Sequence, residues 1–294
     1  MKPQDVLAHQ PLILSQQARE SYFEQGYAVA AGFLNTQWLQ RLQGAYLSAV
    51  ERSREVSSSN DWFSLQSDHN RDEPRIQRIE KIPDQDNEFW EFVIHSDIAD
   101  LAADIVGPDV VYRDSMINVK CPGTGGAVAW HQDLPFYPHT NTSTIQILIA
   151  LYDIPAEQGP LTVIPGSHKG RIYDHYDDDN NWTGKVSQPD MDAINLDDAV
   201  ELTCRAGDAI VLHPLTLHGS APNRSERSRP VLIHGMSAAD AISYTAMTWG
   251  NSHSGELIRG KPARYAHHED MIMPLPPDWS DGYTSIFEHH QRDR

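Results

Sequence analysis

From residue 109 onward the sequence changes into short apolar or β-branched runs separated by Gly, Pro and Asn, and this change constrains the fold more than any other feature. Runs of this length and composition are typical of β-strands. A series of strands without intervening helices favours an antiparallel sandwich or barrel. We therefore expect strands at residues 109–120, 143–154, 160–164, 199–204, 208–213 and 229–236.

The first hundred residues predict helices that pack outside this β-rich core. Ser15 is a candidate N-cap for a helix that Gly26 ends. A second helix is expected over residues 35–56, where apolar side chains recur at helical spacing, and a third over residues 88–107. Residues 57–75 are polar and aperiodic, which predicts a loop. The expected fold class is mainly β with flanking helices.

The 294 residues are enough to bury a sizeable core, and they contain neither internal repeats nor a convincing domain linker. We expect a single domain over residues 1–294, with a helical part over about 1–107, a β-rich core over about 108–236 and an irregular C-terminal part over 237–294. A long acidic insertion at 173–198 interrupts the core, and loops of this length are frequently lids or binding loops.

Charge and cysteine content exclude several classes of partner. Lys and Arg total 23 against 41 Asp and Glu, a formal charge of −18, which repels nucleic acid and anionic membranes. Cys121 and Cys204 cannot form a disulfide framework, which fits a reducing compartment. Residues 1–14 lack the pattern of a signal peptide, and no apolar run approaches the ~18 residues of a membrane span. A cytoplasmic location and a small-molecule partner are expected.

A His-x-Asp spacing occurs four times and is therefore weak evidence by itself. His95/Asp97 lies in an expected helix, where residues two apart do not share a face. His175/Asp177 lies in the acidic insertion, where a solvated loop is expected, and His268/Asp270 lies in the polar C-terminal part. Only His131/Asp133 lies in the strand-rich half. Two residues two apart on a strand point to the same face, so this pair is the candidate for a metal site at the mouth of the barrel.

A third metal ligand has to come from another strand, and residues 212–235 offer His213, His218 and His234. Two histidines and one carboxylate leave open positions on the ion, as in non-haem Fe(II) oxygenases. Arg229, eleven residues after His218, begins an apolar strand and requires an anion, because an unpaired buried guanidinium is costly. Either a bound carboxylate or an internal salt bridge would satisfy it.

Three segments together resemble the phytanoyl-CoA dioxygenase family of Fe(II)/2-oxoglutarate oxygenases: WHQDLPFYP, GPLTVIPGSHKG and LHGSAPNRSERSRP. The resemblance begins at YFEQGYAVAAGFL and ends near residue 236, about four fifths of the chain. It implies a double-stranded β-helix, the cupin-like jelly roll, as the core. It also implies Fe(II) as cofactor, with 2-oxoglutarate and O2 as cosubstrates.

The resemblance assigns roles to individual residues. His131, Asp133 and His218 would hold iron, and Arg229 would bind the distal carboxylate of 2-oxoglutarate. Three more side chains would lie near the cosubstrate: Ser220, Lys120 and Gln146. The implied reaction decarboxylates 2-oxoglutarate to succinate and oxidises a C–H bond of the substrate, with hydroxylation as the default outcome. The carboxylate at Asp133 excludes the related halogenases, which have a small residue there.

The substrate itself is not specified by the sequence. Candidate pocket residues are Phe136, Tyr137, Trp182 and Trp249, because aromatic side chains dominate ligand sites. Gln132, the residue before Asp133, is a further candidate, although a polar residue in a barrel strand is as easily a satisfied core group. Acidic residues of the insertion could attract a cationic substrate, although charge runs are usually solvated. Two other functions remain open: a jelly-roll metal enzyme that does not use 2-oxoglutarate, and a non-catalytic binding module. Homodimer contacts through the C-terminal residues are a further alternative.

Overall fold

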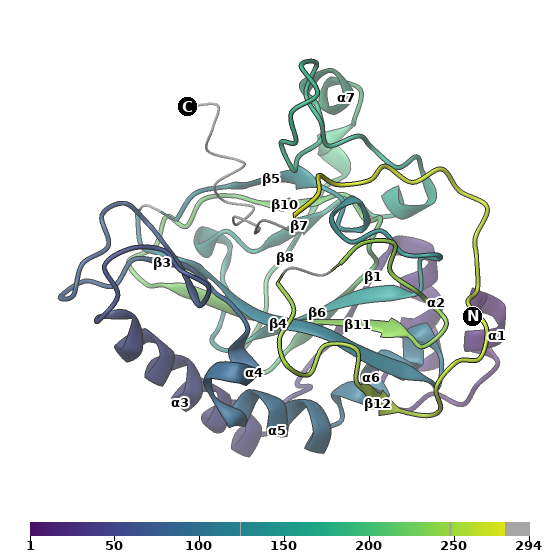
Figure 1. Cartoon of the computed structure of the whole chain (residues 1–294), viewed down its shortest axis with the longest axis horizontal. Coiled ribbons are helices and arrows are strands. Elements are labelled where there is room, and N and C mark those ends of the chain that lie inside the picture. The colour runs from purple at the N-terminus through teal and green to yellow at the C-terminus, as the bar shows by residue number, and fades with distance from the viewer. Residues whose placement is uncertain (124, 247–248, 280–294) are drawn as a thin grey trace.

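Two antiparallel sheets that face each other form the β-rich half of the protein (Figure 1). The computed structural model describes residues 1–123, 125–246 and 249–279. The larger sheet has the order β1 (Tyr27–Ala30), β9 (Ala209–Leu212), β6 (Thr144–Ala150), β11 (Arg229–Ala238), β4 (Val110–Lys120), β3 (Ile76–Ile79) and β2 (Phe63–Leu65), and β12 (Leu257–Arg259) also pairs with β4. The smaller sheet has the order β5 (Val128–His131), β10 (His218–Ser220), β7 (Leu161–Val163) and β8 (Val200–Leu202).

Helices cover the outer face of the larger sheet (Figure 1). They are α1 (Pro3–Leu7), α2 (Gln16–Gln25), α3 (Thr36–Ser53), α4 (Ile82–Gln85), α5 (Asn87–His95) and α6 (Ile98–Val106), while α7 (Gln188–Asp192) lies in the acidic insertion. The principal hydrophobic core forms between these helices and the sheet, where Leu42, Phe92 and Leu101 join Ile117 and Ile147. Because all five side chains are fully buried, truncating one of them to alanine should cost about 2–5 kcal/mol.

The two faces of β4 explain how this core and the site are separated. Ile117 and Val119 point into the hydrophobic core beneath the helices, whereas Met116, Asn118 and Lys120 line a cavity between the two sheets. This alternation is the two-residue period of a strand. The larger sheet therefore has an apolar outer face that binds the helices and a mixed inner face that is available for chemistry.

The helix boundaries follow the local signals in the sequence. The hydroxyl of Ser15 accepts a hydrogen bond from the backbone N–H of Ala18, and Gly26 ends α2 with a φ of 85°. The side chain of Asn35 caps α3 in the same way. The helix expected over 88–107 is broken at Ser96 and Asp97 into α5 and α6.

The expected fold class, mainly β with flanking helices, is confirmed. Each of the six expected strands is present, although the one expected over 143–154 ends at Ala150. The loop expected over 57–75 contains β2. Five other strands lie outside the six expected ranges, and each is only three or four residues long: β1, β3, β5, β10 and β12. Such short runs carry too few alternating positions to be distinguished from loops.

The acidic insertion is more ordered than its composition indicates. It contains α7, an isolated bridge between Tyr176 and Trp182, and a 3-10 turn at Leu196–Asp198. In the C-terminal part, the carbonyl of His267 accepts a hydrogen bond from Asn141, and β12 pairs with β4. None of the helices in the described ranges is both long and apolar enough to cross a membrane.

Candidate metal centre and cosubstrate pocket

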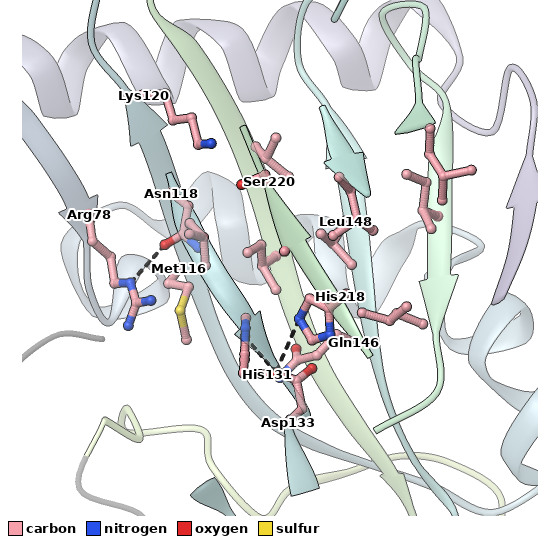
Figure 2. A pocket seen from close by; sticks show the side chains of 18 of the residues that line it. Arg78, Met116, Asn118, Lys120, His131, Asp133, Gln146, Leu148, His218 and Ser220 are labelled. Carbon is pink, nitrogen blue, oxygen red and sulfur yellow. Dashed lines mark hydrogen bonds and ion pairs between the residues drawn. The ribbon is translucent and has the colours of Figure 1, made fainter. Parts of the chain in front are cut away.

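His131, Asp133 and His218 converge at one end of the smaller sheet (Figure 2). His218 of β10 pairs directly with His131 of β5, and the two ring centroids are 4.0 Å apart. Asp133 Oδ1 lies 3.7 Å from His131 Nε2 and 3.6 Å from His218 Nε2. One potential ligand atom from each residue lies within 4.8 Å of the other two, so a single ion can contact all three.

Asp133 reaches the two histidines through a turn rather than along a strand. β5 ends at His131, and Asp133 has helical backbone angles as it begins the 3-10 turn Leu134–Phe136. The backbone N–H of Asp133 donates a hydrogen bond of 2.9 Å to the carbonyl of Pro214. The strand alternation expected for His131 and Asp133 is therefore not the cause of their proximity; the turn and its contact with Pro214 bring the carboxylate to the rings.

Both imidazole rings are oriented by backbone carbonyls. His131 Nδ1 lies 2.8 Å from the carbonyl of Ala129, and His218 Nδ1 lies 2.9 Å from the carbonyl of Thr216. In each case the carbonyl can only accept, so Nδ1 carries the proton and the Nε2 lone pair points toward Asp133. Histidines that bind metals are usually held in this way. Two imidazole nitrogens and one carboxylate suit a divalent transition metal such as Fe(II).

The pKa of Asp133 is shifted by its burial and by the charged and polar side chains around it. Burial raises the pKa of its carboxyl, while His218 and a hydrogen bond from Tyr137 lower it. Tyr137 also accepts a hydrogen bond of 3.2 Å from Gln146, and the guanidinium of Arg113 lies 3.9 Å above its ring. The carboxylate is thus only slightly exposed, with 15% of its side chain accessible, and its polar neighbours fix its orientation.

The triad opens into a cavity between the two sheets (Figure 2). Its wall on the larger sheet consists of inward-facing side chains from neighbouring strands, and its other wall comes from the smaller sheet and the turn after β5. Most of the lining is apolar; the polar side chains are Arg78, Asn118, Lys120, His131, Asp133, Gln146, His218, Ser220 and Arg229. Asp133 is the single carboxylate among these lining residues.

Arg229 and Lys120 are two neighbouring basic side chains that are buried in this wall. They pair across β11 and β4, and their exposed fractions are 8% and 2%. Burial lowers the pKa of Arg229 to about 10. Burial, together with the charge of Arg229, lowers the pKa of Lys120 to about 6. The Nζ of Lys120 donates to the carbonyl of Ala221.

The surroundings of Arg229 favour a bound anion. Within the described part of the chain, its buried Nε has no hydrogen-bond partner. Leaving a buried guanidinium nitrogen unsatisfied costs about 1–3 kcal/mol or more. A carboxylate placed between Arg229 and Lys120 would satisfy that nitrogen, neutralise the guanidinium and favour the protonated form of Lys120. Ser220, two residues after His218 on β10, also lines this part of the cavity.

The remaining pocket residues expected from the sequence differ in whether they line the cavity. Phe136, Tyr137, Gln146 and Trp249 line the cavity. Trp182 packs edge-on against Phe136, with ring centroids 5.1 Å apart, and it supports the cavity wall without being part of the lining.

Gln132 lies outside the cavity lining and has a different environment from the one expected. Its fully buried side chain donates to the carbonyls of Arg171 and Leu215 and accepts from the N–H of Tyr173. Its own backbone N–H donates to Nε2 of His175. A strand position before Asp133 suggested the pocket, but the turn directs this amide toward the acidic insertion instead.

His175 was expected in a solvated loop, and that interpretation is wrong. The residue is fully buried, and its ring stacks on Trp182 with an interplanar angle of 20°. The neighbouring Asp177 is exposed and accepts hydrogen bonds from the N–H groups of Asp179 and Asn181. The insertion is therefore anchored by His175, and its acidic side chains stabilise turns on the outside.

Three polar residues of this region were not identified from the sequence as site candidates. Arg78 and Asn118 line the cavity, and Arg113 lies over the ring of Tyr137. Arg78 lies on β3, in a segment just after the expected loop 57–75 for which the sequence predicted no structure. Asn118 lies on an expected strand, two residues before Lys120, so the alternation that placed Lys120 in the cavity could have placed Asn118 there as well.

A family model described as phytanoyl-CoA dioxygenase (PhyH) matches residues 22–231. A probable alpha-ketoglutarate-dependent hypophosphite dioxygenase from Stutzerimonas stutzeri is 27% identical over 278 residues, which cover 94% of this chain and 96% of that protein. The peroxisomal phytanoyl-CoA dioxygenase of Bos taurus is 25% identical over 232 residues, which cover 75% of this chain and 67% of that protein.

Solved structures share the fold. The non-haem alpha-ketoglutarate-dependent carbocyclase SnoK from nogalamycin biosynthesis superposes with a TM-score of 0.62 and 24% identity, over 79% of this chain and 88% of that chain. EctD from S. alaskensis with bound Fe superposes with a TM-score of 0.66 and 18% identity, over 88% of both chains. The two facing sheets are thus a jelly roll of the cupin type. The chain belongs to the phytanoyl-CoA dioxygenase family and is an oxygenase that depends on iron and 2-oxoglutarate.

Proposed function

We propose that His131, Asp133 and His218 hold Fe(II), and that the enzyme hydroxylates a C–H bond of a small organic molecule. The observation that carries this proposal is that the triad and the buried pair Arg229 and Lys120 line one cavity. Iron and 2-oxoglutarate, when bound, supply the activation of O2, with decarboxylation of 2-oxoglutarate to succinate coupled to oxidation of the substrate.

The residues of this chain position the reactants. Arg229 and Lys120 bind the distal carboxylate of 2-oxoglutarate, and Ser220 donates a hydrogen bond to the same group. Gln146 holds the hydroxyl of Tyr137, which donates to Asp133 and fixes the direction of that carboxylate. Leu148, Val231 and Ile233 keep the cosubstrate region apolar, which strengthens the contacts of its charged groups.

Oxidation of hypophosphite is a second candidate function. It is favoured by the relative from Stutzerimonas stutzeri, which is similar over nearly the whole of both chains. Hypophosphite has P–H bonds, and hydroxylation of such a bond needs the same iron and cosubstrate arrangement. The substrate of this chain can therefore be sought among both organic molecules and phosphorus oxyanions.

Succinate formation tests the proposed function. Enzyme loaded with Fe(II) and supplied with 2-oxoglutarate and O2 should release succinate slowly alone and faster when a substrate is present. The His218→Ala variant should release none. If 2-oxoglutarate does not bind to the manganese-loaded protein in calorimetry, the enzyme belongs instead among jelly-roll metal enzymes that need no cosubstrate.

We infer further that residues 1–294 act as one domain in the cytoplasm. The single-domain proposal is supported by the principal core, which joins side chains from Leu14 to Ala241. The cellular location is supported by Cys121 and Cys204, both buried as free thiols.

A further inference from the structure

Lys120 is the single buried lysine among the six of this chain, all of which lie in the described ranges. Its exposed fraction is 2%. The other five are exposed or half-buried: Lys2, Lys81, Lys169, Lys185 and Lys261. Figure 2 shows the amine of Lys120 inside the cavity, on the side of Ser220 and away from the metal triad. Lys120 therefore presents an amine to small molecules that enter this part of the cavity.

The charges around Lys120 favour the neutral form of its amine. Asp133 is the single carboxylate among the residues that line the cavity, and it belongs to the metal triad. The direct partner of Lys120 across β4 and β11 is Arg229, another base. Burial lowers the pKa of Lys120 to about 6, and the charge of Arg229 acts in the same direction. At pH 8 the amine is mainly unprotonated, which is the form in which a lysine is a nucleophile.

The hydrogen bonds around Lys120 are compatible with one substituent on its nitrogen. The Nζ of Lys120 donates to the carbonyl of Ala221. A neutral amine carries two N–H groups and a lone pair, so it can exchange one hydrogen for a substituent and keep the other for Ala221. The buried Nε of Arg229 has no hydrogen-bond partner among the described residues. A carboxylate formed on Nζ would thus lie beside a guanidinium that needs an acceptor.

Carbon dioxide is the reagent that converts a neutral amine into such a carboxylate. The enzyme depends on 2-oxoglutarate, and its decarboxylation releases CO2 in the cavity that the triad and Lys120 both line. No other reactant is required, because CO2 is itself the electrophile.

We propose that Lys120 reacts reversibly with CO2 to form a carbamate, whose carboxylate binds Arg229 in the place of the distal carboxylate of 2-oxoglutarate. The lone pair of Nζ forms the N–C bond, one C–O π pair moves onto oxygen, and the nitrogen releases one proton to solvent, so nothing is oxidised or reduced. The carbamate and 2-oxoglutarate exclude each other, and CO2 is therefore a product that inhibits at the cosubstrate site. This consequence rests on the proposed function, in which Arg229 and Lys120 hold the cosubstrate.

Isotope-labelled bicarbonate, which supplies CO2, tests for the carbamate in the full-length, metal-free protein at pH 8. We expect one carbamate signal in the carbon NMR spectrum that is lost in Lys120→Met and kept in Lys169→Met. Lys169 is the matched control, because it is an exposed lysine that pairs with Glu24. Carbamates at the N-terminal amine or at exposed lysines would remain in Lys120→Met. Trapping with triethyloxonium converts the carbamate into a stable ethyl ester, and the masses of the peptides should place that ester on Lys120.

Calorimetry with manganese-loaded protein measures the competition with the cosubstrate. If about two-thirds of the protein is carbamylated, only the remaining third binds 2-oxoglutarate, and the apparent Kd rises about threefold. We expect a rise of this size when bicarbonate replaces chloride at equal ionic strength, and no rise in Lys120→Met. Saturating 2-oxoglutarate should also abolish the carbamate signal of Lys120.

The proposal is overturned if wild-type protein forms no carbamate at Lys120, if the signal survives in Lys120→Met, or if 2-oxoglutarate binds without displacing it. The position of the ethyl ester is read from wild-type protein, so this result does not depend on the folding of a variant. Failure of 2-oxoglutarate to bind wild-type protein in the absence of bicarbonate contradicts the proposed function separately, because the carbamate is detected without the cosubstrate.

Discussion

His218 lies directly opposite His131 across the pair of strands β10 and β5, with both Nδ1 atoms on backbone carbonyls and both Nε2 atoms within 3.7 Å of Asp133. The position of each imidazole is thus fixed by main-chain hydrogen bonds rather than by mobile side chains. Because the fold brings the three ligands together, metal binding to the folded protein should stabilise it.

Metal binding should raise the melting temperature, and the rise should grow with the logarithm of the free metal concentration once this exceeds the Kd. A ligand present at 100 times its Kd adds about 2.7 kcal/mol to the free energy of unfolding. We expect a rise in Tm when Mn(II) is added to metal-free protein, measured by calorimetric scanning, and its reversal by a chelator. His218→Ala should show no rise, whereas a variant with the same rise as wild type would place the metal elsewhere.

Arg229→Gln should weaken 2-oxoglutarate binding by about 30-fold or more, because truncating one partner of a buried charge pair costs about 2–5 kcal/mol. Arg227→Gln is the matched control, since Arg227 is an exposed residue two positions earlier. The measurement is the Kd of 2-oxoglutarate for manganese-loaded protein. Equal affinities for the two variants would mean that Arg229 does not contact the cosubstrate.

Binding of 2-oxoglutarate should be accompanied by proton uptake at Lys120. The pKa of Lys120 is lowered to about 6, so the amine is largely neutral at pH 8 in the free protein, whereas Arg229, with a pKa of about 10, stays charged. A carboxylate bound beside Lys120 favours its protonated form. Affinity for 2-oxoglutarate should therefore fall as pH rises above 6.

Calorimetry in buffers of different ionisation enthalpy measures this uptake directly. At pH 8 wild-type protein should take up more protons per 2-oxoglutarate than the Lys120→Met variant. The folded state also binds the Lys120 proton less tightly than the unfolded chain, so this group makes stability rise with pH between about 6 and 10.5, a slope that Lys120→Met should remove. The same proton count in both proteins would exclude Lys120 as the group that titrates.

Gln132→Ala should destabilise the protein without changing cosubstrate affinity. The substitution removes two donors and one acceptor that hold the backbone of Arg171, Tyr173 and Leu215, and each buried group left unsatisfied costs about 1–3 kcal/mol. Urea denaturation should show a lower free energy of unfolding. Gln188→Ala, at an exposed helix position, is the control and should remain close to wild type.

The β-rich core and its helical cover were predictable because their signals are local. The alternation along β4 and the caps at Ser15 and Asn35 depend on residues close together in the sequence. The roles of His131, Asp133, His218 and Arg229 could be inferred through the family resemblance, because the four residues follow one another in the order and spacing of its motif.

Contacts that depend on tertiary structure were not predictable in this way. Nothing local indicates that Gln132 turns toward the acidic insertion, that His175 is buried against Trp182, or that Arg78 of β3 lines the same cavity as the metal triad. Homodimer formation stays a prediction of the sequence, which the mass of the protein in solution would test.

The visible spectrum of oxygen-free protein with Fe(II) and 2-oxoglutarate tests the central claim most directly. Chelation of iron by the cosubstrate at the triad predicts a weak charge-transfer band that appears only when both are added. The double variant Asp133→Ala/His218→Ala should lack this band, and Arg229→Gln should require a higher concentration of 2-oxoglutarate to reach it. Absence of the band in wild-type protein, or its persistence in the double variant, would contradict the assignment of this site.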